Sequence, residues 1–162
     1  MFREMRRSKQ LLSKETAIEI LNRNTSGTLA LLGDDGYPYA VPISYVYADE
    51  KLYMHSAKTG HKIDAIKRHE KASFCVIDRD QIVPEKYTTY FRSVIAFGKI
   101  RLVEDKDEMR RIAAMLAMKY SPQFEAGIQQ EIDSSIDRMA IIEMAIDHMT
   151  GKEAIELVNA GK

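Results

Sequence analysis

Residues 55–62 of the sequence, HSAKTGHK, combine hydroxyl groups, a glycine and cationic side chains within a few positions. Ser56 and Thr59 supply hydroxyl donors, and Gly60 allows the backbone to come close to a ligand. A phosphate group is recognised by such a combination of cations, donors and accessible backbone. The pattern therefore permits two interpretations, a phosphate cradle or a solvated loop that caps the following helix.

A helical pattern begins near His61 and favours the cradle. The free N–H groups of its first turn and the positive end of its dipole would point back at the loop. Lys62 adds a full charge in the same turn. The stretch is not a P-loop, because the first glycine of GxxxxGK[ST] is missing. Residue types alone do not decide between the cradle and the cap.

The residue types give little support to a metal site, a hydrolase site or a disulfide. The four histidines form neither an HExxH motif nor a helical pair, so we expect no metal site. A Ser–His–Asp hydrolase lacks the GxSxG turn. The single cysteine, Cys75, excludes an intrachain disulfide, and its neighbours in ASFCVI indicate a buried small side chain.

The composition limits the partners that the chain can have. The 162 residues are 45% hydrophobic and 30% charged, with zero formal net charge, so no large nucleic-acid footprint is expected. No apolar stretch reaches the roughly 18 residues of a membrane span. The start, MFREMRRSKQLL, lacks the apolar core of a secretory signal. We therefore expect a cytoplasmic protein that binds neither nucleic acid nor a membrane.

Hydrophobic periodicity predicts helices around a central set of strands. Helical segments are expected over 13–23, 61–69, 105–120, 121–138 and 152–162. Strands are expected over 28–33, 37–50, 51–57, 71–79, 88–104 and 139–151. Pro38 and Pro42 place their strand at a sheet edge or a bulge, and Gly98 suggests a bulge within its strand. Residues 80–87 are expected to form a loop.

Antiparallel strands joined by tight turns, with helices at the ends and in one crossover, indicate a mainly-β α+β fold around a barrel. No repeat or linker divides the chain, so one domain over 1–162 is expected.

Four segments in a fixed order resemble the FMN-binding split-barrel proteins related to pyridoxamine 5′-phosphate oxidase. They are GYPYAVPISYVY (36–47), LYMHSAKTGHKIDAI (52–66), YFRSVIAFGKIRLVED (90–105) and MTGKEA (149–154). Within this family the chain looks most like the 5-nitroimidazole resistance (Nim-like) branch. The resemblance implies a six-stranded antiparallel Greek-key split barrel with flanking helices. It also implies a homodimer that binds FMN in a groove between its subunits.

The resemblance also implies which residues contact the cofactor. Contacts along the isoalloxazine ring are expected from Val41, Pro42, Ile43, Ser44 and Tyr45. The segment that holds the phosphate is expected to include His55, Ser56, Ala57, His61 and Lys62. Ser93, with Arg92, is expected to reach the flavin from the partner subunit. The oxidases use RK where this chain has HK, and their C-terminal arginine motif is absent, so the oxidase activity itself is not implied.

Two functions therefore compete. The first is an FMN-dependent oxidoreductase, in particular a nitro-group reductase acting on a small molecule, with no side chain assigned as a catalytic acid or base. The second is a non-catalytic flavin- or haem-binding module, for which His55, His61 or His148 could ligate haem iron. A deazaflavin cofactor and a plain interaction domain also stay open.

Overall fold

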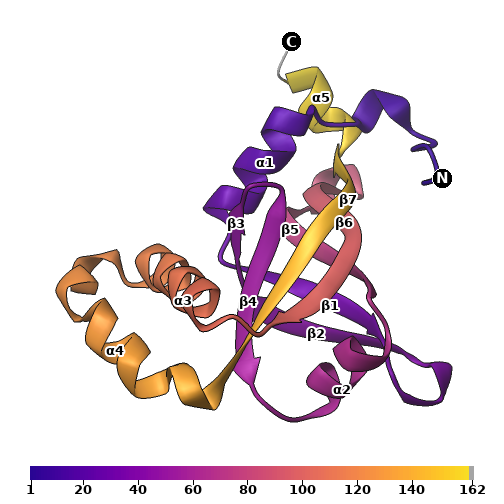
Figure 1. Cartoon of the computed structure of the whole chain (residues 1–162). Helices are drawn as coiled ribbons and strands as arrows, with labels where there is room; N and C mark the ends of the chain where they lie inside the picture. The colour runs from indigo at the N-terminus through magenta and orange to yellow at the C-terminus, as the bar shows by residue number, and fades with distance from the viewer. Residues whose placement is uncertain (161–162) are drawn as a thin grey trace.

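Seven antiparallel strands form one sheet in the computed structural model, which describes residues 1–160 (Figure 1). Residues 161 and 162, the end of the predicted domain and of its last helical segment, lie outside the described residues. The strands are β1 (Ser26–Leu32), β2 (Pro38–Ser44), β3 (Val46–Ala48), β4 (Lys51–Ala57), β5 (Lys71–Val83), β6 (Thr88–Val103) and β7 (Met139–Glu153). The helices are α1 (Lys14–Arg23), α2 (His61–Arg68), α3 (Lys106–Tyr120), α4 (Ile128–Ser135) and α5 (Ile155–Ala160). The mainly-β α+β prediction is confirmed.

The strand count and the closure of the sheet differ from the prediction of a six-stranded barrel. The hydrogen-bonded order is β2–β1–β5–β6–β7–β4–β3, so β2 and β3 lie at opposite ends of an open order. They are consecutive in the chain and only Tyr45 separates them. The backbone N–H of Tyr45 donates to the hydroxyl of Tyr120 at 2.8 Å, and that hydroxyl donates to the Tyr45 carbonyl at 2.8 Å. Because a side chain occupies these backbone groups, the ladder is interrupted there.

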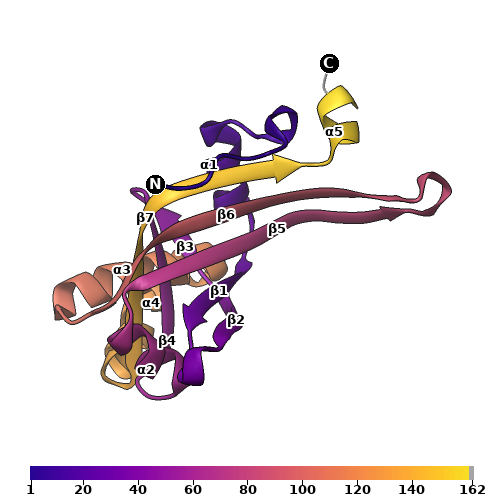
Figure 2. The same ribbon diagram turned by 90° about the vertical axis from the view of Figure 1, so that its right-hand side faces the viewer.

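The loop predicted over 80–87 is also wrong, because most of this segment belongs to a hairpin. β5 continues to Val83, which pairs with Thr88 at the start of β6. A register shift between Ile77 and Arg79 marks a bulge, beyond which the ladder resumes. The charged residues after Ile77 favour a loop by composition, but cross-strand hydrogen bonds hold them in strands. Figure 2 shows the hairpin projecting beyond the rest of the sheet.

Several local predictions are confirmed at the level of single residues. Ser13 caps α1 by accepting from the Thr16 N–H at 3.1 Å, and Asp105 caps α3 by accepting from Glu108 at 2.8 Å. The ladder between β6 and β7 shifts register at Gly98. A Cβ at Gly98 would lie 1.9 Å from the Ala145 carbonyl oxygen, so the close approach of β7 requires a glycine there.

Alternation along the strands divides the apolar side chains between two clusters. The larger cluster packs the inner face of the sheet against α1 and α2, and Leu52 and Met54 of β4 belong to it. The smaller cluster packs β4 and β7 against α3 and α4, and it contains Tyr53. Figure 1 shows α3 and α4 on the side of the sheet that carries β4, with α2 apart from them. Strand β4 therefore presents one face to each cluster. No helix within residues 1–160 is long and apolar enough to cross a membrane.

Candidate functional site

The turn before α2 has the backbone geometry of an anion cradle. Gly60 has φ +119°, a conformation that favours glycine, and a Cβ placed there would meet nothing within 4 Å. The first intrahelical bond runs from the Asp64 N–H to the Gly60 carbonyl at 3.1 Å. The N–H groups of residues 61–63 therefore have no helical carbonyl to bind, and within residues 1–160 no side chain caps this end of α2. These donors have no hydrogen-bond partner among the described residues.

Two basic side chains, His61 and Lys62, lie at the start of α2, and they differ in their contacts. The His61 ring stacks on Tyr39 with centroids 4.1 Å apart, and its Nε2 lies 3.7 Å from a carboxylate oxygen of Asp34. Lys62 is half-buried, and burial lowers its pKa without any carboxylate of residues 1–160 offsetting that effect. A desolvated cation without an acidic partner gains from an anionic ligand. Lys62 is therefore the stronger candidate for a phosphate contact.

The predicted ring-contacting residues of β2 point to two different faces. Val41 and Ile43 pack against the larger cluster, whereas Pro42 and Ser44 are exposed on the other face. Tyr45 is fully buried, and its hydroxyl donates to the Leu21 carbonyl at 2.7 Å. Burial raises the pKa of Tyr45 above its usual range. β2 lies at the end of the sheet order, so one row of its backbone groups faces away from the ladder, as its prolines predicted.

Strand β4 likewise separates His55 from Ser56. His55 is exposed, and with Ser44 it lines a cavity of about 250 Å³ against α3 and α4. Ser56 is half-buried on the opposite face of the strand, and the exposed Ala57 ends it, three residues before Gly60. The helical walls of this cavity were missed by sequence reasoning, because they come from segments more than 50 residues further along the chain and no local motif marks them.

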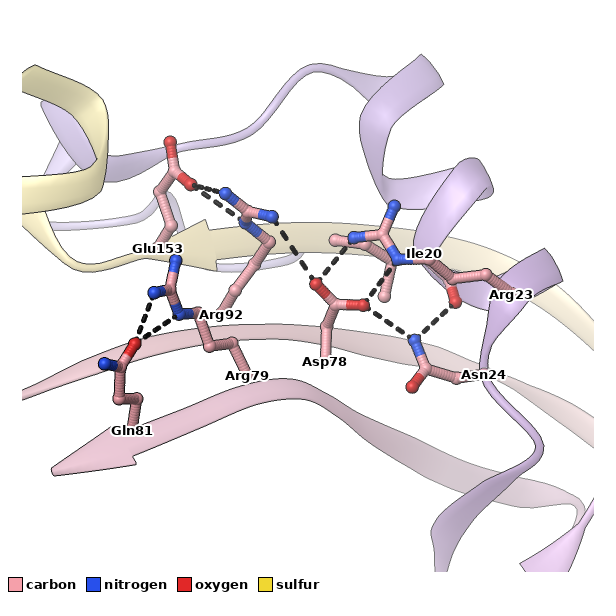
Figure 3. Close-up of polar contacts among 8 residues, drawn as sticks. All are labelled: Ile20, Arg23, Asn24, Asp78, Arg79, Gln81, Arg92 and Glu153. Atoms are coloured by element: carbon pink, nitrogen blue, oxygen red, sulfur yellow. Dashed lines mark hydrogen bonds and ion pairs between the residues drawn. The ribbon is translucent and has the colours of Figure 1, made fainter. Parts of the chain in front are cut away.

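Ser93 and Arg92 lie on β6, away from the start of α2. Ser93 is opposite Ile77 and Lys152 on the outer face of the sheet. Arg92 is bound within a polar network, at 2.8 Å from Glu153 and 3.6 Å from Asp78 (Figure 3). Its guanidinium is therefore already paired with carboxylates of the same chain.

The outer face of the sheet carries an uncharged row across five strands. Cross-strand pairing aligns, in order, Pro42, Thr28, Cys75, Ile95 and Thr150. Ile95 is 39% exposed, and Cys75 is half-buried. These five residues, which we call the outer row, are all uncharged, and the row begins on the exposed side of β2 at Pro42.

The residues present fit a flavin phosphate better than they fit a metal. The start of α2 offers free N–H groups, an open glycine and a desolvated lysine, which together suit a phosphate. Within residues 1–160, no group of three or more His, Cys, Asp or Glu side chains is placed to hold a metal ion.

Comparison with proteins of known structure finds the same fold in several proteins, two of which are described as FAD-binding. A candidate 5-nitroimidazole antibiotic resistance protein from Bacteroides thetaiotaomicron is 22% identical, with a TM-score of 0.72 over 88% of this chain and 86% of that chain. A FAD-binding protein from Mesorhizobium loti is 26% identical, with a TM-score of 0.66 over 90% and 97%. A FAD- and haem-binding protein from Mycobacterium smegmatis is 22% identical, with a TM-score of 0.74 over 95% and 80%.

Sequence comparison gives the family. No curated protein matches the sequence significantly. The family model described as pyridoxamine 5′-phosphate oxidase matches residues 13–153, which include every strand and all the candidate residues discussed above. The chain therefore belongs to the pyridoxamine 5′-phosphate oxidase family.

Proposed function

We propose that the protein is an FMN-binding oxidoreductase whose flavin lies at a homodimer interface. The observation that carries the proposal is the start of α2, where Gly60, Lys62 and free N–H groups form a cradle without an acidic partner for the lysine. The flavin named for two of the similar structures is FAD, and it supports a flavin here. FMN ends in a phosphate monoester, which suits a cradle at a single helix start.

The chain's residues would hold and orient the cofactor. Lys62 and the first N–H groups of α2 would bind the phosphate, with Ser56 and His61 beside them. Pro42 and Ser44 would present an uncharged surface to the ring, and the free backbone edge of β2 would hydrogen-bond its polar rim. When bound, the flavin would supply the electron transfer.

The proposed reaction is the reduction of a nitro group on a small molecule. Two electrons and two protons would convert a nitro group to a nitroso group and water, and the electrons would come from an external hydride donor. The 5-nitroimidazole resistance protein of similar fold supports this choice. The free thiol of Cys75 suits a reducing cytoplasm, and the balanced charge gives no reason to propose a nucleic-acid partner.

A haem-binding module is the second candidate, because one similar structure binds FAD and haem. His61 is stacked on Tyr39, and His148 is stacked on Phe2 with centroids 4.6 Å apart. His55 is the remaining ligand candidate, but its cavity of about 250 Å³ is below the roughly 300–1,000 Å³ of drug-sized sites. The flavin is therefore better supported.

A titration of the cofactor-free protein tests the proposal. FMN fluorescence is expected to quench on binding, and the complex is expected to be yellow and to bleach with dithionite. A protein that takes up haem with a Soret band and leaves FMN unbound would favour the haem module. Binding of neither would remove the cofactor assignment altogether.

We expect the outer row to form the interface of a homodimer, with Ile95 buried in it. Ile77, next to the row, is 64% exposed, and such an uncharged, partly apolar surface is suited to a second copy of the chain. Sedimentation is expected to give twice the 18.5 kDa of one chain.

Ile95→Lys buries an unpaired charge in the interface and is expected to weaken dimerisation by about tenfold or more. Met118→Lys makes a matched change at a residue of similar exposure on α3 and should leave the dimer intact. A monomer with FMN bound would contradict a site shared by two subunits.

A further inference from the structure

The cavity lined by Ser44 and His55 is a built pocket inside one subunit. Residues of α3 and α4 form one wall, and Ser44 of β2, His55 of β4 and Met139 of β7 form the other. Leu116 and Ile132, which line it, are 5% and 4% exposed and belong to the smaller cluster. Packed side chains hold these walls, so the pocket is present before any ligand arrives.

We propose that this pocket binds the reducible substrate, and that the substrate is a small, uncharged molecule with a single ring. The inference rests on the proposed function, because it assumes that a flavin lies along β2. Three properties of the pocket carry it: its size, its polarity and its position.

The size of the pocket restricts the ligand to one ring. A cavity of about 150 Å³ accommodates benzene, and sites for drug-sized ligands start near 300 Å³. The volume of about 250 Å³ lies between these values. At the same volume per atom the pocket holds about ten non-hydrogen atoms, enough for one ring with a nitro group and too few for a fused two-ring nitro compound.

The polarity of the pocket disfavours anions. Ala113, Leu116, Ala117 and Ile132 make most of the wall apolar. Glu131 is the only carboxylate among the lining residues, and neither lysine nor arginine lines the pocket. A negatively charged ligand would be desolvated without a cationic partner. The exposed His55 ring and Ser44 hydroxyl can instead hydrogen-bond a neutral polar substituent.

The position of the pocket connects it to the proposed flavin. Ser44 is the last residue of β2 and lies on the exposed face that also carries Pro42. It therefore belongs both to the surface proposed for the ring and to the lining of the pocket. A ligand whose polar group bonds to Ser44 would have its reducible group beside the proposed cofactor.

Ligand-observed NMR on the flavin-free protein tests the pocket independently of flavin binding. Nitrobenzene and 2-methyl-5-nitroimidazole are expected to bind, whereas 4-nitrobenzoate and 1-nitronaphthalene are expected to bind at least about tenfold more weakly, through charge and size respectively. Equal binding of all four compounds, or of none, would overturn the inference.

Two variants locate the binding. Ala117→Phe fills the pocket and is expected to weaken nitrobenzene binding by about tenfold or more. Met118→Phe, at the next position of α3 but outside the pocket, should not change it. Leu116→Ala enlarges the pocket and should admit 1-nitronaphthalene. Unchanged binding in folded Ala117→Phe, or no gain in Leu116→Ala, would place the ligand elsewhere.

Titration of FMN into the same variants separates the two proposals. FMN affinity is expected to stay within about threefold of the wild type, since neither residue belongs to the cradle. If wild type binds nitrobenzene but no FMN, the proposed function fails and the substrate assignment of the pocket falls with it. If FMN binds and the pocket variants reduce nitro compounds like wild type, only the pocket inference fails.

Discussion

Replacing Lys62 with glutamate is expected to lower FMN affinity by about 100-fold or more. Lys62 is half-buried at the start of α2, where burial lowers its pKa. A bound phosphate would supply the missing counter-charge. Because Lys62 is half-buried, water would screen this ion pair only weakly. Truncating one partner of such a pair costs about 2–5 kcal/mol, and each 1.4 kcal/mol is tenfold in affinity. Glutamate adds repulsion to that loss. Quenching of FMN fluorescence measures the change.

Matched variants on the same helix make this result specific. Lys67→Glu makes the same charge change in the last turn of α2 at an exposed residue, and it should alter FMN affinity by less than about threefold. Lys62→Gln should fall between wild type and Lys62→Glu, because it removes the attraction without adding repulsion. Wild-type affinity in Lys62→Glu would mean that the phosphate binds at another place.

Replacing Asp78 with alanine is expected to destabilise the fold by about 2–3 kcal/mol. Asp78 sits at the bulge of β5 with its side chain 8% exposed. Both of its oxygens accept from Arg23 at 2.6 Å, and Asn24 donates to one of them at 2.9 Å (Figure 3). Arg92 lies 3.6 Å away and connects the carboxylate to Glu153.

The physical reason for this loss is that Asp78 joins elements that are distant in sequence. Its carboxylate fastens the end of α1 to the base of the β5–β6 hairpin. Without it, the partly buried guanidinium of Arg92 loses one ion-pair partner and the amide of Asn24 retains only the Ile20 carbonyl. The expected loss is below the roughly 3–5 kcal/mol of a fully buried pair, because Arg23 is 46% exposed.

Urea unfolding measures the stability change, with Asp80→Ala as the control. Asp80 is exposed two residues further along the same strand, so its removal should change stability by no more than about 0.5 kcal/mol. Equal stabilities for Asp78→Ala and wild type would show that the side-chain network around Asp78 adds no stability to that of the β5–β6 backbone ladder.

The same carboxylate predicts a pH dependence. Burial disfavours the charged form of Asp78, but the bonds from Arg23 and Asn24 and the charge of Arg92 outweigh it and lower its pKa. Because the pKa of Asp78 is lower in the folded state, its charged carboxylate stabilises the fold above the unfolded pKa of about 3.9. This stabilisation is lost as the pH falls through the folded pKa. The stability difference between wild type and Asp78→Ala should therefore be largest near neutral pH and narrow below about pH 4. A difference that stays constant from pH 7 to pH 3 would contradict this assignment.

The structure separates what is local in this chain from what is not. The helices and their caps at Ser13 and Asp105 were predictable, because each depends on neighbouring residues. The glycine itself indicated the bulge at Gly98, but the approach of Ala145 that requires it is a tertiary contact. The turn from Gly60 to Lys62 could be singled out by its residue types, and its phosphate is a proposal. The family could be identified from the order of such segments along the chain.

Only the tertiary structure decided the rest. The first half of the predicted loop over 80–87 is paired strand and only 84–87 form the turn, and the strand through Tyr45 is interrupted by the hydroxyl of Tyr120, 75 residues away. The network around Asp78 and the pocket under α3 and α4 likewise bring together residues from separate parts of the chain. Side-chain contacts of this kind depend on the order of the strands in the sheet and on the face to which each side chain points. A sequence pattern shows which side chains alternate along one strand, but it does not show which strands or helices lie beside that strand.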